Sequence, residues 1–156
     1  MSDSTLAQPA VQSLLGQWPV ATLSTFGTHG IDTVPVVFWY NGAGQLFIPH
    51  DGKPKRQGRL QRFRNLEADP RCTLLFQHYS ADWRQLWWLR VRGTGVTQSL
   101  GEGPAEGLRA KYPQYAHTEL TPGNEAVRVE IRAARLWSAT SDLDVDDIGR
   151  MLECVT

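Results

Sequence analysis

The sequence predicts a mainly β fold, a six-stranded and mostly antiparallel β-barrel with a few short helices. From residue 19 onward the chain consists of short apolar runs separated by Gly-rich breaks, a pattern typical of all-β proteins. The last run alternates Val127, Val129 and Ile131 with charged residues, as a half-buried strand does. The length of 156 residues fits one domain with a single core.

The elements follow in order. A first helix is predicted over Leu6–Leu15, where apolar residues recur at helical spacing. A second helix is predicted in the basic segment. Asp51-Gly-Lys-Pro precedes it, it continues to about Glu67, and Asp69-Pro70 ends it. A third is predicted over Ala105–Tyr112, and a loop over 118–124. The six strands are predicted over Val20–Thr25, Thr33–Tyr40, Gln45–His50, Arg71–Tyr79, Leu86–Gln98 and Val127–Ser138.

Three local features refine this outline. Pro35 inside the second predicted strand indicates an edge, an end or a bulge, because proline cannot donate to a sheet. Gly93 and Gly95 indicate a bend or bulge in the fifth. The acids from residue 142 onward partly match a calcium loop, but Asp147 stands where that loop needs glycine, so we expect a solvated acidic tail. The predicted division is 1–18 helix and lead-in, 19–140 barrel and 141–156 tail.

Composition excludes several classes of protein. The 16 basic and 16 acidic residues cancel, which argues against a general nucleic-acid binder. No apolar run approaches the ~18 residues of a membrane span, and the N-terminus lacks the features of a signal peptide. The two cysteines form neither a disulfide framework nor a zinc motif, so we expect no metal site. This cysteine usage fits a protein of the reducing cytoplasm. Cys72 is most simply a small core residue.

The segment from Lys53 to Arg64 carries six cations in twelve residues. In a helix, Lys55, Arg59 and Arg62 would share one face, where like charges repel. A phosphate bound beside a helix N-terminus would offset that repulsion. A solvated basic helix is the alternative, and the segment alone does not decide between them.

Six tryptophans are more than one small core requires, and Trp83, Trp87 and Trp88 lie close together. Such side chains favour interfaces and flat-ligand sites, although they can also fill a barrel interior. The sequence contains no self-sufficient catalytic constellation. If the protein is an enzyme, a cofactor therefore carries the chemistry.

The run Arg64-Asn-Leu-Glu-Ala-Asp-Pro-Arg71, after a strand with Val-Pro-Val and a basic segment, resembles the pyridoxamine 5'-phosphate oxidase-like FMN-binding split β-barrel family. Lys53-Pro-Lys-Arg, His78-Tyr79 and Leu86-Trp-Trp88 resemble more closely its subgroup of probable coenzyme F-420-dependent enzymes. The resemblance spans about Pro19 to Ser138. The C-terminal Arg-Leu-x-Pro ending of true pyridoxamine-phosphate oxidases is missing, which argues against that substrate.

The resemblance implies a homodimer with two cofactor sites at the subunit interface. It implies phosphate contacts from Lys53, Lys55, Arg59 and Arg62. It places the ring system of the cofactor on two strands, and the residues at those positions here are Val34, Pro35, Val36, Ile48, Pro49 and His50. It also implies that aromatic residues of the partner chain cover the ring, for which Trp87 and Trp88 are the candidates. No catalytic residue is assigned.

The expected function is a flavin- or deazaflavin-dependent oxidoreductase that transfers hydride between bound F-420 or FMN and a small conjugated organic substrate. F-420 is favoured because its anionic tail can meet extra cations such as Arg56 and Arg64. The alternative is a non-enzymatic protein that carries flavin or haem for storage or sensing. Haem would need an axial ligand, for which His50 and His78 are the candidates. We expect neither nucleic acid nor membrane as a partner.

Overall fold

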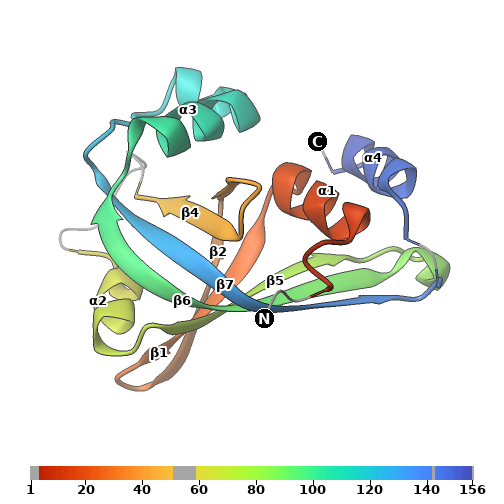
Figure 1. Cartoon of the computed structure of the whole chain (residues 1–156), viewed down its shortest axis with the longest axis horizontal. Helices are drawn as coiled ribbons and strands as arrows, with labels where there is room; N and C mark the ends of the chain where they lie inside the picture. Colours follow the sequence, from red (N-terminus) through yellow and green to blue (C-terminus); the bar gives the residue numbers. More distant parts are fainter. Residues whose placement is uncertain (1–3, 51–58, 142, 156) are drawn as a thin grey trace.

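The computed structural model describes residues 4–50, 59–141 and 143–155, and its centre is one strongly bent sheet of seven antiparallel strands (Figure 1). The strand order across the sheet is β2-β1-β5-β6-β7-β4-β3. The strands are β1 Ala21–Gly27, β2 Gly30–Val36, β3 Trp39–Tyr40, β4 Gln45–Pro49, β5 Arg71–His78, β6 Trp87–Ser99 and β7 Glu125–Ser138. The mainly β antiparallel prediction is confirmed, with seven strands where the sequence predicted six.

The additional strand arises because the single strand predicted over Thr33–Tyr40 is two. β2 pairs with β1 and ends at Val36, whereas β3 pairs with β4 at the other end of the strand order. Between them lies Phe38, which is fully buried, and its backbone N–H donates to the Tyr112 hydroxyl (3.2 Å). Pro35 lies in β2, an outermost strand of the sheet, which confirms the edge position that proline indicated.

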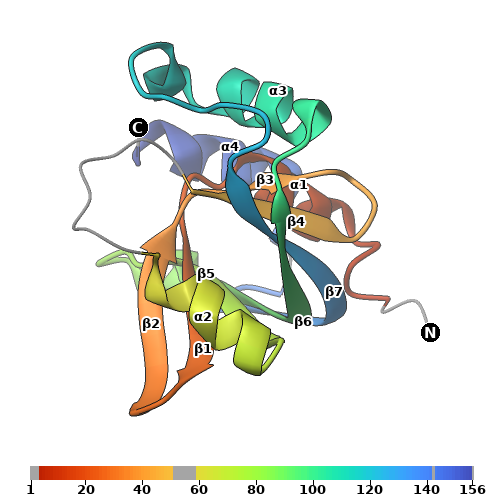
Figure 2. The ribbon, with the colours of Figure 1, turned by 90° about the vertical axis from the view of Figure 1, so that its left-hand side faces the viewer.

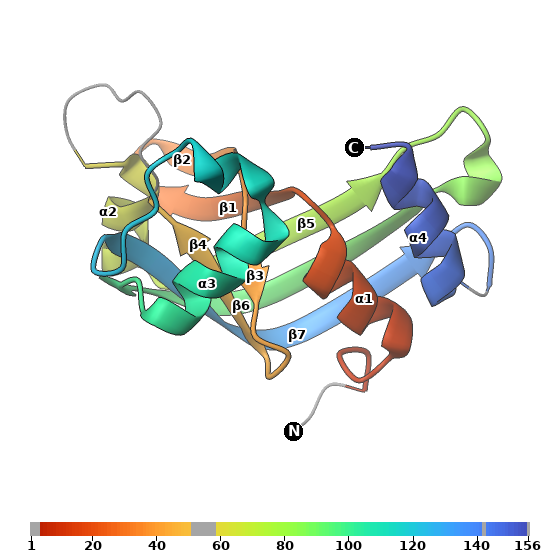
Figure 3. The same ribbon diagram turned by 90° about the horizontal axis from the view of Figure 1, so that it is seen from above.

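In the described part of the chain, four helices and two 3₁₀ turns accompany the sheet. α1 Pro9–Gln17 and α4 Val145–Glu153 pack side by side, as Figure 3 shows from above. α2 Gln61–Ala68 packs on β1 and β6, and α3 Glu102–Lys111 lies against β3 (Figure 2). The 3₁₀ turns are η1 Trp83–Gln85 and η2 Pro113–Ala116. No helix in the described ranges has the length and apolar character needed to cross a membrane.

The basic helix is shorter than the sequence predicted. α2 begins at Gln61, because Leu60 has the extended angles φ −60° and ψ 140°. Arg59 precedes the helix, so the predicted shared helical face of Arg59 and Arg62 is wrong. Lys53 and Lys55 lie outside the described residues.

The C-terminal segment also differs from the solvated tail that was predicted, because most of it forms α4. The Asp144 carboxylate accepts from the Asp147 backbone N–H (2.8 Å), and Asp147 reciprocates, which makes a capping box. Ile148 on this helix is fully buried in the main core. Asp144 and Asp146, which resembled part of a calcium loop, therefore lie at the start of a helix instead.

The predicted irregularity at Gly93 is confirmed as a β-bulge. The register between β6 and β7 shifts after Arg92, which leaves Arg132 without an opposite residue. A Cβ atom at Gly93 would overlap the carbonyl oxygen of Glu130, so only glycine fits this close approach. Cys72 is 6% exposed within the main core, which confirms it as a core residue.

Candidate functional site

The end of β4 and the start of α2 meet around the buried ring of Phe63. The guanidinium carbons of Arg59 and Arg62 lie 5.7 Å and 5.5 Å from the centre of that ring. The His50 ring centre lies 5.3 Å away on the same aromatic side chain. We call His50, Arg59, Arg62 and Phe63 the β4–α2 cluster, and it unites three of the predicted cofactor-binding residues.

Arg59 is held by two carboxylates. Its guanidinium donates to Glu67 through Nη1 and Nη2, both at 2.6 Å, and to Glu125 through Nε at 3.0 Å and through Nη2. The hydrogen bonds to Glu67 and Glu125 raise the pKa of Arg59, and the bond from Arg59 lowers the pKa of Glu67. A phosphate that uses Arg59 must therefore compete with these two carboxylates.

Arg62 and the start of α2 supply further donors. Arg62 Nη2 donates to the carbonyl oxygen of Pro49 (3.3 Å), which ties the helix to the end of β4. Leu60 at the N-cap makes no side-chain capping bond, and the first turn of α2 carries no acidic residue. Guanidinium groups beside a helix N-terminus without a side-chain cap are a donor set that fits a phosphate.

The remaining predicted ring contacts lie on two strands. Val36 and Ile48 are both buried in the main core, Pro49 is buried at the end of β4, and Val34 and Pro35 are exposed on β2. In Figures 2 and 3 the end of β4 points toward α2 and β2. Ile48 and Pro49 therefore adjoin the β4–α2 cluster, to which His50 belongs, whereas Val34 and Pro35 lie on a different strand.

The two adjacent tryptophans have opposite environments, because successive residues of a strand face opposite sides of the sheet. Trp87 is 1% exposed, packs edge-on against Trp18 (ring centres 4.6 Å apart) and donates to the Met151 sulfur (3.1 Å). Trp88 is half-buried on the other face and lies parallel to Trp137, with ring centres 6.4 Å apart. Of these two tryptophans, Trp88 is therefore the one that keeps part of its surface exposed.

Asn65 anchors α2 and gives the Arg64–Arg71 run a structural role. Its amide nitrogen donates to Thr25 Oγ1 (3.0 Å) and to Asp32 Oδ2 (2.7 Å), while its amide oxygen accepts from Gln61 (2.8 Å). Asn65 is 3% exposed. These bonds fix α2 against the β1–β2 hairpin and so fix the position of Arg62.

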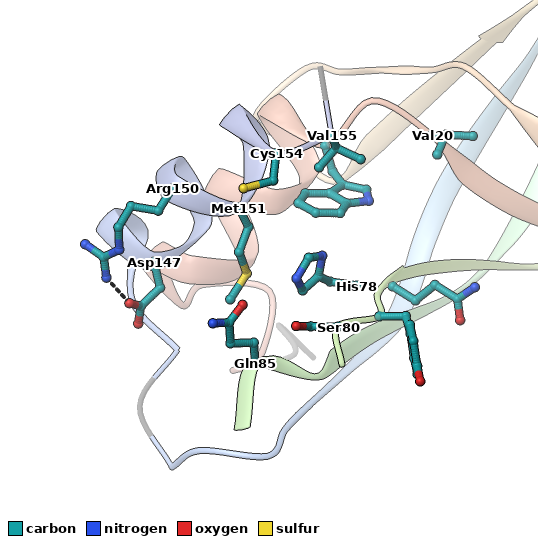
Figure 4. Close-up of a pocket in the computed structure, with 12 residues that line it drawn as sticks. Val20, His78, Ser80, Gln85, Asp147, Arg150, Met151, Cys154 and Val155 are labelled. Carbon is teal, nitrogen blue, oxygen red and sulfur yellow. Dashed lines mark hydrogen bonds and ion pairs between the residues drawn. The ribbon is translucent and has the colours of Figure 1, made fainter. Parts of the chain in front are cut away.

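A separate cavity of about 720 Å³ lies between α4 and the end of β5 (Figure 4). His78 points into it, facing Met151, with Cys154 and Val155 above, and an Asp147–Arg150 ion pair lies on α4 at its edge. Burial lowers the pKa of His78, which favours the neutral form of its imidazole. The lining residues are Trp18, Val20, Gln77, His78, Tyr79, Ser80, Gln85, Asp147, Arg150, Met151, Cys154 and Val155.

The sequence from residue 7 to 138 matches the family model described as pyridoxamine 5'-phosphate oxidase. The chain belongs to this family. The match covers all seven strands, so the family resemblance seen in the Arg64–Arg71 run is confirmed. No curated protein matches the chain.

Solved structures show the same split-barrel fold at low identity. A putative pyridoxamine 5'-phosphate oxidase from Listeria innocua is 15% identical over 85% of this chain and 94% of that one, with a TM-score of 0.56. An F-420 reductase is 20% identical over 80% and 94%, with a TM-score of 0.54. A haem storage protein from Vibrio cholerae is 14% identical over 76% and 84%, with a TM-score of 0.55.

Solved proteins that share this fold therefore include some named for redox chemistry and some named for haem. In the described part of this family member, no group of three or more His, Cys, Asp or Glu side chains could hold a metal ion. Sequence reasoning missed Phe63 as part of the β4–α2 cluster, and it missed Glu67 and Glu125 as the partners of Arg59. Phe63 was detectable as the one aromatic residue in the basic segment, whereas nothing in the sequence links Glu125 to Arg59.

Proposed function

We propose that this protein binds a phosphorylated flavin-type cofactor, F-420 or FMN, and transfers hydride between it and a small conjugated organic substrate. The observation that carries the proposal is the β4–α2 cluster, a phosphate-compatible donor set in a member of the pyridoxamine 5'-phosphate oxidase family. When bound, the cofactor supplies the redox chemistry, and this chain supplies binding, orientation and exclusion of water.

The proposed roles follow the geometry. Arg62 and the first backbone N–H groups of α2 bind the phosphate, and Phe63 supports the guanidinium groups from below. Arg59 contributes once the phosphate displaces one carboxylate from it. Lys53 and Lys55, from the segment that the structure does not describe, are proposed as further phosphate ligands.

The ring system is proposed to lie along two strands, beside Val34, Pro35 and Val36 on β2, beside Ile48 and Pro49 on β4, and beside His50 directly after β4. We propose a homodimer in the cytoplasm, in which Trp88 of one chain covers the ring bound to its partner. Trp87 does not fit that role, because it is buried beneath α4 in its own chain.

The test is calorimetric titration with FMN and F-420. Arg62→Ala should weaken both cofactors by about tenfold or more, the scale of one charge-assisted hydrogen bond. Arg84→Ala is the matched control, because Arg84 is exposed and pairs with Asp82 far from the cluster in sequence. Unchanged affinity of Arg62→Ala for both cofactors would refute the phosphate site.

Salt dependence distinguishes the two cofactors. If F-420 is the native ligand, its affinity should exceed that of FMN, and the difference should shrink as salt screens contacts to the anionic tail. Arg64, exposed on α2, is a candidate for such contacts. Tighter binding of FMN at low salt would assign FMN instead.

The cavity around His78 supports haem binding as a second candidate function. An imidazole whose neutral form is favoured points into a cavity of about 720 Å³ that also holds the Met151 sulfur. Imidazole and thioether are both axial ligands of haem iron. A Soret band that is shifted and sharpened relative to free haemin when haemin is added to the purified protein, and that His78→Ala loses, supports this candidate. A spectrum identical to that of free haemin with the wild type eliminates it.

A further inference from the structure

Three arginines from adjacent strands line a second pocket, of about 490 Å³, that shares no residue with the β4–α2 cluster. They are Arg71 on β5, Arg92 on β6 and Arg132 at the bulge of β7. We call it the arginine pocket. Its lining residues are Ser24, Thr25, Phe26, Ile31, Arg71, Cys72, Thr73, Arg92, Gly93, Thr94 and Arg132.

Strand register places hydroxyl groups between the guanidinium groups. Arg71 lies opposite Thr94 across β5 and β6, and Arg92 lies opposite Thr73. The bulge adds Arg132, whose Nη2 lies 3.5 Å from Thr94 Oγ1. The pocket therefore offers a surface of guanidinium and hydroxyl donors.

Two of these cations are not neutralised by the protein. Arg71 is paired with Asp69 at 2.6 Å, an interaction that lowers the pKa of Asp69 to about 2. Within residues 4–50, 59–141 and 143–155, no carboxylate lies within ion-pair distance of Arg92 or Arg132. Like charges in one pocket repel, and that cost is offset when an anion binds.

The opposite side of the pocket is apolar. Phe26 on β1 and Ile31 on β2 are register partners, and they are 45% and 67% exposed. The Arg71 guanidinium lies 4.6 Å from the centre of the Phe26 ring, so this aromatic face adjoins the cationic side directly. A ligand that fits both sides has acidic groups at one end and an apolar body at the other.

We propose that the arginine pocket binds a small organic dianion, a dicarboxylate or a phosphate monoester, with its acidic groups on Arg92 and Arg132 and its apolar body on Phe26 and Ile31. The planar guanidinium fork matches both acid types. A volume of about 490 Å³ lies within the range of small-molecule sites. The proposal goes beyond the proposed cofactor site and does not depend on it.

The test is calorimetric titration with phenyl phosphate and with phthalate, and phenol serves as the neutral control. We expect either dianion to bind with one site per chain, and whichever binds more tightly identifies the acid class. Arg92→Gln and Arg132→Gln should each lower the affinity about tenfold or more. Arg84→Gln, which removes an exposed arginine outside both sites, should not change it.

A second variant tests the apolar side without removing charge. Ile31→Ser should weaken phenyl phosphate severalfold and leave inorganic phosphate unaffected. The proposal is overturned if neither dianion binds at millimolar concentration, or if the arginine variants bind as tightly as the wild type. It is also overturned if Arg92→Gln changes only self-association, because the pocket would then serve contacts between copies of the chain.

Discussion

The two cysteine thiols occupy opposite environments, which makes their reactivity a direct test of the core. Cys72 is 6% exposed, and burial raises the pKa of its thiol to about 11. Cys154, beyond the end of α4, is exposed. Because the thiolate is the reactive form, one thiol per folded chain should react quickly with Ellman's reagent, and the second only in denaturant. Cys154→Ser should remove the fast reaction, whereas a fast reaction that persists in this variant would contradict the buried position of Cys72.

Lys111 makes stability depend on pH. Its Nζ donates to the Phe38 carbonyl oxygen (3.1 Å), and burial lowers the pKa of Lys111 from 10.5 to about 7. The unfolded chain then binds more protons than the folded chain between these values, so the free energy of unfolding should rise as pH increases from about 7 toward 10.

Lys111→Met isolates this contribution, because methionine keeps the apolar stem and removes the titrating amine. Urea unfolding at several pH values should show a flatter dependence for the variant than for the wild type. The Phe38 ring, 3.5 Å from Nζ, favours the ammonium form and opposes the effect of burial. Identical pH profiles for the two proteins would mean that the ring and the carbonyl cancel burial completely.

At the scale of single residues, the sequence was a better guide to the charged side chains of the site than to the residues that pair with them. It predicted phosphate contacts from Arg59 and Arg62, which stay a prediction, and the structure brings both guanidinium groups to Phe63. Glu125 pairs with Arg59 although 66 positions separate them, because β4 and β7 are neighbours only in the folded sheet. Such pairs depend on strand order, which local periodicity does not encode.

Strands and helices were predicted where the periodicity of apolar residues is strong. They were missed where the chain changes from one pairing strand to another. All six predicted strands overlap strands of the structure, and the long β5, β6 and β7 match closely. The division of the second strand into β2 and β3 was missed, because a continuous apolar run does not show where the chain leaves one strand for another. α4 was missed because its acids were compared with a calcium loop rather than with a capping box.

The packing of α3 on β3 gives a matched pair of glycine variants in one helix. A Cβ atom at Gly107 would overlap the Trp39 ring, whereas nothing lies within 4 Å of one at Gly103. Alanine favours helix over glycine by up to about 1 kcal/mol, so Gly103→Ala should raise the free energy of unfolding. Gly107→Ala should lower it, because Trp39 must move from its contact with Phe47.

Thermal unfolding of the two variants beside the wild type checks this prediction. The expected order of melting temperatures is Gly103→Ala, wild type, Gly107→Ala. A Gly107→Ala protein as stable as Gly103→Ala would mean that Trp39 relocates at no cost. The contact between α3 and β3 would then contribute little to where the chain passes from β2 to β3.

Across the whole molecule, one face of the sheet combines features of a protein interface. Trp137 is 43% exposed and lies parallel to the half-buried Trp88 across β6 and β7. The same strand alternation places Arg90 on the face of Trp88. Aromatic and arginine side chains are the residues that interfaces enrich, so this face is the one on which we expect two chains to associate.

The predicted dimer should bury on the order of 2,000 Å² or more and stay associated at micromolar concentration in sedimentation experiments. Trp88→Ala should shift it toward monomer, because truncating a central aromatic residue typically costs more than 2 kcal/mol of binding energy. Tyr79→Ala removes an exposed aromatic residue that lines the His78 cavity, and it should leave association unchanged.

Association and cofactor binding should then be coupled. If Trp88 covers a cofactor bound to the partner chain, FMN or F-420 should tighten the dimer, since a ligand that binds only the associated state stabilises it by mass action. Dilution of the wild type should correspondingly weaken its apparent cofactor affinity, because the dimer dissociates. The Trp88→Ala dimer is weaker, so this loss of affinity should already occur at a higher protein concentration than in the wild type. A monomer that binds either cofactor with undiminished affinity would separate the two properties. The β4–α2 cluster would then be sufficient without a second chain.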